Sequence, residues 1–424
     1  MALKGRNPHV MNIAIEAFSL SEATITGIGN VTLNYLTQLR LLDKENDYYV
    51  YTIDGLNHIS LDGRWRHILY TSPTRRARLA IRDAWVRSIS PCARGGVVRQ
   101  LWALILRLVK MAVVLADECW FVVWLWHSLR KNRVDVYVGT FADFFPLLLP
   151  SRVKALWLLH DLVWKRYPST MKKRLSLTSL FFRWNMNRAD MLVAISEATK
   201  QDAMNLLKVK TRIEVIPHAA DSRTFYRASS PDVASVMKKY GIQKPYILSV
   251  CTLEPRKNLR ALLEAYGMIE RPERIRLVLV GMKGWKTSDL YEMMKKHRLA
   301  DGIVVTGYVP SRDLAPLYSG ASVFAFPSLY EGFGLPVLEA MQCGCPVITS
   351  NVSSLPEVAG DACILVDPRD SQSLAAAIER VLASPSLRRS MARKGLIRAR
   401  GFSWERSARL LMGYIHSISA GREA

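Results

Sequence analysis

The chain has 424 residues, half of them apolar, and a formal net charge of +23. This length accommodates two or three domains with ordinary hydrophobic cores, and the composition excludes a disordered protein. The charge indicates an anionic partner, such as a nucleic acid, an acidic membrane surface or a phosphorylated substrate. The six cysteines lack zinc-type or redox spacing, so we expect reduced core thiols in a cytoplasmic protein without a secretion signal.

A buried strand and a helix are predicted at the start of the chain. The strand covers Asn12–Ala17, and after a loop the helix begins with Gly27-Ile-Gly29 and runs through Leu42. A glycine turn between a strand and a helix suits a phosphate, because the first turn of the helix presents unpaired N–H groups. A single Gly-x-Gly is a weak signal, so this turn indicates phosphate binding only together with other motifs.

Residues 64–134 depart from a regular alternation of strands and helices. Two apolar runs, 101–116 and 119–126, flank Asp117 and Glu118, and neither reaches the roughly 18 uninterrupted apolar residues of a spanning helix. The tryptophans in these runs have amphipathic rings suited to a membrane interface. We therefore predict a membrane-surface hairpin within an insertion over about 75–131, with a pair of core helices or a true span as alternatives. The residues that carry this prediction are Arg75, Arg76, Arg78, Arg82, Arg87, Arg94, Arg99, Arg107, Lys110, Arg130, Lys131, Trp102, Trp120, Trp124 and Trp126.

Regular alternation resumes near residue 134. The next predicted strands are Val134–Val138, Ala155–Leu159, Met191–Ile195 and Arg212–Ile216. His160 and Asp161 follow the second of these strands, where α/β proteins place binding groups. From this position alone, a loop histidine with a structural partner is an equally good interpretation. Ser196 follows the third strand and is a typical N-terminal helix cap.

The second half of the chain repeats this layout more regularly. Helical patterns follow most of its strands, and such alternation predicts a parallel, doubly wound sheet. The chain therefore contains two Rossmann-like domains, joined near residues 220–240, without the fingerprint of a dinucleotide cofactor. A last helix is predicted from about Phe402 to about Ile418. The predicted strands of this half are Tyr246–Val250, Arg276–Val280, Ile303–Thr306, Val323–Phe326, Pro346–Thr349 and Cys363–Val366.

A basic motif follows the first strand of the second half. Tyr246–Val250 leads into Glu254-Pro-Arg256-Lys257-Asn258. Cationic side chains at a strand-to-helix junction can neutralise a diphosphate whose negative charge grows as a bond to it breaks. Arg256 and Lys257 are therefore candidates for stabilising a leaving group. The alternative is a solvated basic turn.

The most informative segment, residues 327–341, contains the run Glu-Gly-Phe-Gly-Leu-Pro from residue 331 and a second glutamate at 339. A buried strand precedes it, and Pro336 has the fixed φ suited to the first turn of a helix. Gly332 and Gly334 allow the backbone to approach a ligand closely, and the helix N-terminus suits a diphosphate. Glu331, and Glu339 in the expected first helical turn, can accept hydrogen bonds from sugar hydroxyls. The alternative is a surface acid and a helix-start acid stabilised by the helix dipole.

These motifs resemble those of retaining glycosyltransferases of family 4 (glycosyl transferases group 1), in particular bacterial GDP-mannose-dependent mannosyltransferases. The resemblance rests on the glutamate pair with Gly-Phe-Gly-Leu-Pro, on Glu-Pro-Arg-Lys-Asn and on His160-Asp-Leu. It implies the GT-B architecture, an α/β fold in which two Rossmann-like, doubly wound parallel-sheet domains face a cleft. The implied units are an acceptor-side domain over 1–224, a nucleotide-sugar donor domain over 225–402 and a crossover helix over 403–424 that packs back on the first domain.

The resemblance also implies roles for individual residues. His160 is implied to contact the transferred sugar, Glu331 to hold its hydroxyls and Glu339 to hold the ribose. Arg256 and Lys257 are implied to bind the phosphates. A further phosphate-contacting arginine of the family has no counterpart, since Cys-Thr stands where relatives carry Gly-Arg. The other residues implied to bind the donor are Gly27, Gly29, Gly281, Tyr308, Val309, Gly332, Phe333, Gly334 and Leu335.

The implied function is transfer of a hexose, expected to be mannose from GDP-mannose, to a lipid-linked or polysaccharide acceptor in bacterial surface polysaccharide synthesis. The sequence has no Asp-x-Asp metal clamp, so basic side chains are expected to replace a metal cofactor. The expected partners are the nucleotide-sugar donor, a polyprenyl-diphosphate-linked or other glycan acceptor and the anionic inner face of the plasma membrane, but no nucleic acid. The alternatives are a soluble UDP- or ADP-sugar glucosyltransferase, a GT-B sugar-nucleotide epimerase and a non-catalytic membrane scaffold.

Overall fold

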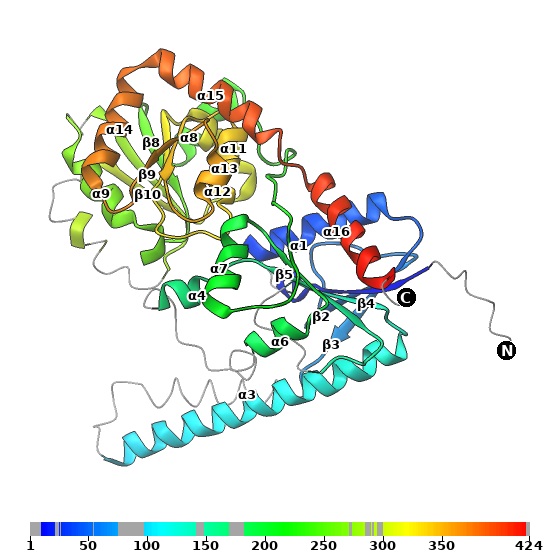
Figure 1. The fold of residues 1–424 in the computed structure, drawn as a ribbon. Helices are drawn as coiled ribbons and strands as arrows, with labels where there is room; N and C mark the ends of the chain where they lie inside the picture. The colour runs from blue at the N-terminus through cyan, green and yellow to red at the C-terminus, as the bar shows by residue number, and fades with distance from the viewer. Residues whose placement is uncertain are drawn as a thin grey trace.

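Two parallel β-sheets, each flanked by helices, form the core of the structure (Figure 1). This computed structural model describes residues 10–21, 25, 27–53, 55–74, 97–140, 148–168, 182–270, 274–284, 290, 292–294 and 300–420, without the side chains of 97–103, 107 and 300. The arginine-rich stretch 75–96 lies outside these ranges.

The first sheet has seven parallel strands in the order β3-β2-β1-β4-β5-β6-β7. In β5, every residue from Ala155 to Leu159 is buried, which is typical of a parallel sheet covered on both faces. The strand order reverses between β1 and β4, so the C-terminal ends of these two strands border a crevice. The strands are β1 Asn12–Glu16, β2 Asp47–Ile53, β3 Trp65–Tyr70, β4 Val136–Gly139, β5 Lys154–Leu159, β6 Met191–Ala194 and β7 Ile213–Val215. The helices beside this sheet are α1 Gly27–Leu42, α3 Val97–Lys131, α4 Val163–Arg166, α6 Phe182–Arg188 and α7 Glu197–Leu207.

The second sheet has six parallel strands in the order β10-β9-β8-β11-β12-β13. Its order reverses between β8 and β11, so the loops after these strands, 251–258 and 327–334, meet at one edge. The predicted strands of this sheet agree with the structure to within one residue at each end. They are β8 Tyr246–Val250, β9 Arg276–Val280, β10 Ile303–Gly307, β11 Val323–Phe326, β12 Val347–Ser350 and β13 Ile364–Val366. The helices are α8 Ser230–Lys239, α9 Leu259–Met268, α11 Ser311–Gly320, α12 Leu335–Gln342, α13 Leu355–Ala359, α14 Ser371–Ala383 and α15 Pro385–Ala399.

The chain crosses between the two sheets twice. Residues 216–229 lead from β7 to α8, and after α15 the last helix, α16 (Trp404–Ala420), lies beside α1 (Figure 1). Leu411 and Ile415 of α16 are buried in the same hydrophobic cluster as Leu36 and Leu39 of α1. This burial of apolar surface on both helices attaches the end of the chain to the first sheet.

The predicted hairpin within 75–131 is wrong for the part that the structure describes, because Val97–Lys131 form one continuous helix. Asp117 does not interrupt it. Its carboxylate is buried and accepts hydrogen bonds from the hydroxyls of Tyr70 and Ser72 in the first domain. These bonds satisfy a carboxylate that would otherwise have favoured a break in the helix.

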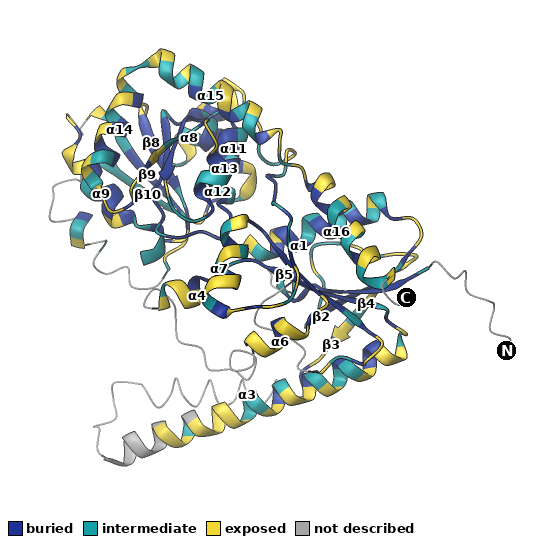
Figure 2. Ribbon diagram, in the orientation of Figure 1, coloured by how far each residue is buried: buried dark blue, intermediate teal, exposed yellow. Residues whose placement is uncertain are grey.

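The two halves of α3 have different surroundings. Phe121, Leu125 and Leu129 in its C-terminal half are buried against the first sheet. In its N-terminal half, residues 104, 105 and 108–112 are all exposed, and Figure 2 shows this half extending away from the sheet. Within the described ranges, no helix combines the length and the apolar character needed to cross a membrane.

Candidate active site

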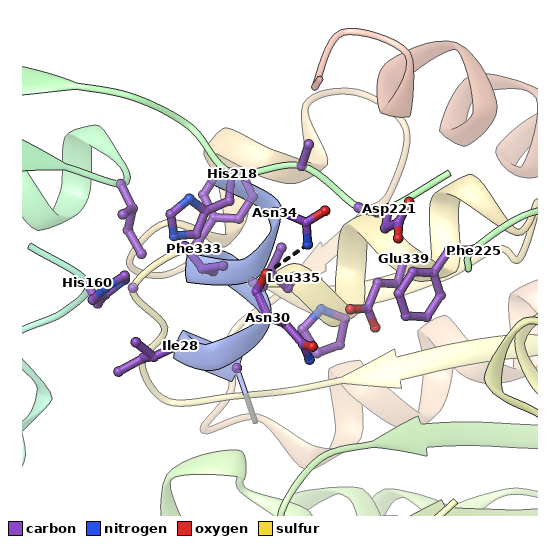
Figure 3. Close-up of a pocket in the computed structure, with 18 of the residues that line it drawn as sticks. Ile28, Asn30, Asn34, His160, His218, Asp221, Phe225, Phe333, Leu335 and Glu339 are labelled. Carbon is purple, nitrogen blue, oxygen red and sulfur yellow. Dashed lines mark hydrogen bonds between the residues drawn. The ribbon is translucent and has the colours of Figure 1, made fainter. Parts of the chain in front are cut away.

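A cleft of about 790 Å³ lies between the two sheets (Figure 3). One wall comes from the first domain and consists of α1 and the loop after β5. The other wall consists of the loops after β8 and β11 and the start of α12. The linker after β7 and the first residue of α16 also line the cleft. The C-terminal ends of strands from both sheets therefore border the cleft. This end of a parallel sheet is where α/β proteins bind ligands.

The loop after β11 brings backbone into the cleft, and its glycines are required for this. Gly334 has φ +105° and caps the N-terminus of α12, a conformation that favours glycine. A Cβ on Gly332 would overlap the backbone oxygen of His160 in the opposite domain. Gly332 therefore allows the two domains to approach at this point. Glu339 is the fifth residue of α12, so its predicted place in the first helical turn is wrong.

Glu331 lies at the centre of a buried charge cluster. Its Oε1 is 2.6 Å from Lys257 Nζ and 2.6 Å from Ser328 Oγ, and its Oε2 is 2.8 Å from Arg256 Nη1. A second carboxylate, Glu254, lies 2.8 Å from Arg256 Nη2. Burial alone would raise the pKa of Glu331, but the positive charges of Arg256 and Lys257 outweigh it and lower this pKa to about 2. Glu331 is therefore ionised throughout the neutral range.

The hydrogen-bonding capacity of this cluster is only partly used. A carboxylate has about four acceptor positions, and the described contacts occupy three of those of Glu331, leaving one on Oε2. Lys257 donates one of its three N–H groups to Glu331, and Arg256 retains Nε–H and one Nη2–H. The cluster can therefore contact a sugar hydroxyl and phosphate oxygens without breaking its ion pairs.

The second glutamate has a different environment. Glu339 lines the cleft, and among the described residues its carboxylate accepts a hydrogen bond from Tyr318 Oη at 3.1 Å. Burial raises the pKa of Glu339 to about 7, although the bond from Tyr318 opposes this shift. Glu339 is thus partly protonated near neutral pH, and its unused oxygen lone pairs face the cavity.

Two buried histidines stand where the halves of the cleft meet. His160 Nε2 lies 2.6 Å from the carbonyl oxygen of Thr140, and because a carbonyl only accepts, this nitrogen carries the proton and Nδ1 is left as an acceptor. His218 lies 5.8 Å from His160 between ring centroids, and neither of its ring nitrogens has a partner among the described residues. Burial lowers the pKa of His160 and, together with the proximity of His160, that of His218. Both imidazoles are therefore neutral at physiological pH.

The structure brings together most of the predicted site residues. Those that line the cleft are Gly27, His160, Arg256, Lys257, Glu331, Gly332, Phe333, Gly334, Leu335 and Glu339. The roles implied for them remain predictions.

Four predicted donor residues do not line this cavity: Gly29, Gly281, Tyr308 and Val309. A Cβ on Gly29 would crowd Ile25, and one on Gly281, which has φ +142°, would overlap the backbone oxygen of Cys251. Close packing thus explains why glycine occupies both positions. Tyr308 is 54% exposed, whereas Val309 is buried in the core of the second domain.

Sequence reasoning missed several residues of the cleft. Asn30 and Asn34 of α1 face it from the first domain, and Asp221 faces it from the linker (Figure 3). Thr224 of the linker also lines it. The two asparagines are four residues apart on a helix that begins with the glycine motif, so they share one face. That polar pair on a largely apolar helix was a usable signal. Nothing comparable in the sequence distinguishes Asp221 from an ordinary loop acid.

Two family profiles match the chain. The profile described as "Glycosyl transferases group 1" covers residues 233–397, and the one described as "Glycosyltransferase Family 4" covers residues 115–223. O-antigen chain mannosyltransferase B from Escherichia coli is 36% identical over 283 residues, which are 66% of this chain and 73% of the relative. Serotype-specific mannosyltransferase WbdA from Escherichia coli is 29% identical over 308 residues, 68% of this chain, but these span just over a third (37%) of that longer relative.

Solved structures resemble the whole chain at low sequence identity. Sucrose-phosphate synthase from Thermosynechococcus elongatus superposes with a TM-score of 0.73 at 20% identity, over 97% of this chain and 100% of that one. Anabaena HepE, solved in complex with UDP and glucose, gives a TM-score of 0.68 at 16% identity, over 96% and 100%. At these identities the likeness concerns the fold.

Proposed function

The chain belongs to glycosyltransferase family 4, and we propose that it transfers mannose from GDP-mannose, with retention of configuration, to a glycan acceptor in bacterial surface polysaccharide synthesis. The predicted glycosyltransferase class and GT-B fold are confirmed by the family match and the superpositions. A glycosyltransferase of this kind binds a nucleotide-sugar donor and a glycan acceptor. The choice of mannose is supported by the two mannosyltransferase relatives.

The observation that carries the proposal is the cluster of Glu331 with Arg256 and Lys257 at the switch point of the second sheet. In the proposed complex, Arg256 and Lys257 use their remaining N–H groups on the donor diphosphate. The remaining acceptor position of Glu331 receives one hydroxyl of the sugar. Glu339 accepts from the ribose, and the first amides of α12 face the phosphate end.

The proposed reaction needs no base from the protein. The acceptor hydroxyl oxygen forms a bond to the anomeric carbon on the face from which the diphosphate leaves. The bond between that carbon and the diphosphate oxygen breaks, and its electron pair stays on the diphosphate. The hydroxyl proton passes to this departing oxygen. Arg256 and Lys257 stabilise the charge that grows on it, so no metal cofactor is required in this proposal.

His160 has a positioning role in the proposed complex. Its Nε2–H is committed to Thr140, so the imidazole offers Nδ1 to the cleft as an acceptor. Nδ1 then accepts a hydrogen bond from a hydroxyl of the transferred sugar. A neutral acceptor at this place orients the sugar without adding a charge beside the reacting carbon.

The proposed acceptor is linked to a polyprenyl diphosphate at the inner face of the plasma membrane, and the enzyme is a cytoplasmic protein bound to that surface. Support comes from the exposed N-terminal half of α3, where Leu104, Leu108 and Val109 face solvent beside Lys110. Exposed apolar side chains along a helix favour a cover, and an apolar membrane interface provides one. The high positive charge of the chain favours an anionic lipid surface.

A donor panel tests this function. The full-length protein is incubated with membranes that contain lipid-linked acceptor and with labelled GDP-mannose, UDP-glucose, UDP-GlcNAc or dTDP-rhamnose. The expected result is label in lipid from GDP-mannose alone. Label from UDP-glucose alone would overturn the mannosyl assignment. Conversion of a free UDP-sugar without any acceptor would indicate an epimerase instead.

A further inference from the structure

The loop after β11, residues 327–334 of the second domain, is called the donor loop below. One of its peptides is hydrogen-bonded to the N-terminus of α7 in the first domain. The carbonyl oxygen of Gly332 lies 2.7 Å from Ser196 Oγ and 3.2 Å from Thr199 Oγ1. Ser196 Oγ accepts the N–H of Thr199 as the helix cap, and its own O–H lies within reach of two acceptors, the Gly332 carbonyl oxygen at 2.7 Å and Thr199 Oγ1 at 3.0 Å, of which the carbonyl is the nearer. All of these groups are buried. The capping serine therefore also donates a hydrogen bond across the cleft.

Two further contacts join α7 to the same region of the second domain. Tyr330 Oη donates to Asp202 Oδ2 at 2.8 Å and accepts from the N–H of Leu162 at 3.3 Å. The carboxylate of Glu357 on α13 accepts the N–H groups of residues 197 and 198, at 2.8 and 2.6 Å. These are two of the amides that the first turn of a helix leaves unpaired, and a negative charge there is favourable. Together these contacts form an interdomain latch, made of Ser196, Thr199 and Asp202 on one side and Tyr330, Gly332 and Glu357 on the other.

The second domain holds the neighbouring peptides of the loop by itself. Ser353 Oγ accepts the N–H of Glu331, and Ser354 Oγ lies 2.9 Å from the carbonyl oxygens of both Glu331 and Phe333. Among the carbonyl groups of residues 331–333, the described hydrogen bonds to Gly332 come from the first domain alone. Its direction is therefore set from across the cleft.

The direction of this carbonyl matters because a trans peptide is planar. When the oxygen of Gly332 points toward the hydroxyls of Ser196 and Thr199 at the N-terminus of α7, the N–H of Phe333 points the opposite way, away from α7. Rotation of this peptide would exchange a donor for an acceptor in the loop that follows Glu331 and lines the cleft. An anionic diphosphate distinguishes strongly between these two arrangements.

We infer that Ser196, Thr199 and Tyr330 are positioning residues that complete the donor loop only when the two domains are closed. The inference rests on the proposed glycosyl transfer and adds that the first domain sets the geometry of the donor site. Closure of the two domains then aligns the Gly332–Phe333 peptide at the same time. A donor bound to an open enzyme meets an unaligned loop, which limits reaction before the acceptor is in place.

Single-hydroxyl deletions in the full-length enzyme test the inference. Thr199→Val and Tyr330→Phe each remove one hydroxyl at nearly constant volume and retain the Ser196 cap. We expect kcat to fall by about tenfold in each variant, the worth of a buried hydrogen bond, while the dissociation constant of GDP changes by less than about threefold. Thr199→Ser, which keeps the hydroxyl, should recover most of kcat. Ser229→Ala removes the N-cap of α8 away from the latch and should leave kcat unchanged.

Small-angle scattering of the ligand-free protein provides a readout that does not depend on activity. The wild type should have the radius of gyration of the closed structure, and Thr199→Val and Tyr330→Phe should have larger values with intact secondary structure. Unchanged kcat and unchanged radius in both variants would overturn the inference. Equal losses in kcat and GDP affinity would also overturn it, because they indicate general damage to the donor site. If the wild type transfers no sugar but the two variants have a larger radius of gyration than the wild type, the proposed function is wrong, whereas the interdomain contacts are supported.

Discussion

Lys257 Nζ lies 2.6 Å from Glu331 Oε1, although the two residues are 74 positions apart in the sequence. Both side chains are almost fully buried. Their strands, β8 and β11, are neighbours at the switch point of the second sheet, so the loops that follow the strands meet. With Arg256 and Glu254, the pair forms a cluster of two cations and two carboxylates. Such a cluster fixes the cations in place before a diphosphate arrives, which is the preorganisation that electrostatic catalysis requires.

Removing the central charge tests this view. Glu331→Gln keeps the shape of the side chain but leaves Arg256 and Lys257 with one counter-charge. We expect the free energy of unfolding to fall by roughly 3 kcal/mol, because one member of a buried ion cluster is lost. We also expect kcat/KM to fall by about 100-fold or more, since the cations lose their alignment. Urea denaturation and initial rates measure the two effects.

The control for this variant is an exposed pair of the same chemistry. Glu405 and Arg409 form an ion pair of 2.7 Å one turn apart on α16, with both side chains largely in solvent. Glu405→Gln should change the free energy of unfolding by less than about 1 kcal/mol and leave the rate unaffected. An equally small effect of Glu331→Gln on stability would contradict a buried, preorganised cluster.

The approach of the two domains at Gly332 can be tested sterically. In Gly332→Ala the new methyl group would meet the backbone oxygen of His160, which cannot move as a flexible side chain could. We expect each domain to remain folded while the domains separate, with a larger radius of gyration and a loss of kcat of at least about 100-fold. Gly413→Ala in α16 has open space around its Cβ and should preserve activity. Full activity of Gly332→Ala would exclude the closed arrangement as the reacting one.

The raised pKa of Glu339 predicts a pH dependence of stability. Burial places this pKa at about 7, above the usual value of 4.5 that applies in the unfolded chain. The folded protein therefore binds the proton more tightly, so the contribution of this group to stability is complete below about pH 4.5 and is lost as the pH rises through about 7. The loss amounts to at most about 3 kcal/mol.

Urea denaturation between pH 5 and 8 measures this effect by comparing the wild type with Glu339→Gln. The variant should lack the decrease in the free energy of unfolding that the wild type shows toward pH 8. In the same range the KM for the donor should fall as pH rises, because ionised Glu339 is the stronger acceptor for a ribose hydroxyl. Parallel pH profiles for the two proteins would show that Glu339 does not titrate in this window.

Local patterns in the sequence predicted much of the fold. The helix Gly27–Leu42 and the strands Tyr246–Val250 and Val323–Phe326 agree with the structure at both ends, because glycine turns and continuous apolar runs mark their boundaries. The strand ends also predicted the location of the site, since parallel sheets collect ligand groups at one edge. The continuous helix α3 was missed because the partners of Asp117 are distant in sequence.

The contacts within the site were less predictable than its location. The sequence motifs assigned Glu331 to sugar and Arg256 to phosphate separately, whereas their side chains are 2.8 Å apart in the structure. The role of Thr199 could not be inferred, because its partner Gly332 lies 133 residues away in the other domain. Such contacts depend on tertiary geometry that neither propensity nor spacing encodes. The i, i+4 spacing of Asn30 and Asn34, by contrast, is a local pattern that places both side chains on one face of α1.

The last prediction concerns α3 and the membrane. Replacing Leu104, Leu108 and Val109 by serine removes exposed apolar surface from the N-terminal half of the helix. Because these side chains contribute to no described core cluster, the fold should be retained. We expect the triple variant to leave the lipid fraction in flotation with vesicles that contain anionic lipid, and transfer to a lipid-linked acceptor to fall at least about tenfold. Trp124 is unsuitable for this purpose, since its ring packs against Tyr70 and the first sheet.

The control for α3 uses apolar residues that are equally exposed elsewhere. Leu41 is 63% exposed and Ile397 is 62% exposed, and neither lies on α3. Leu41→Ser with Ile397→Ser should leave flotation unchanged, because isolated exposed apolar residues are common and do not form a binding surface. Flotation that is equal for the wild type and the triple α3 variant would exclude this helix as the membrane contact. Loss of flotation in neutral vesicles but not in anionic ones would indicate that the positive charge of the chain, rather than α3, dominates binding.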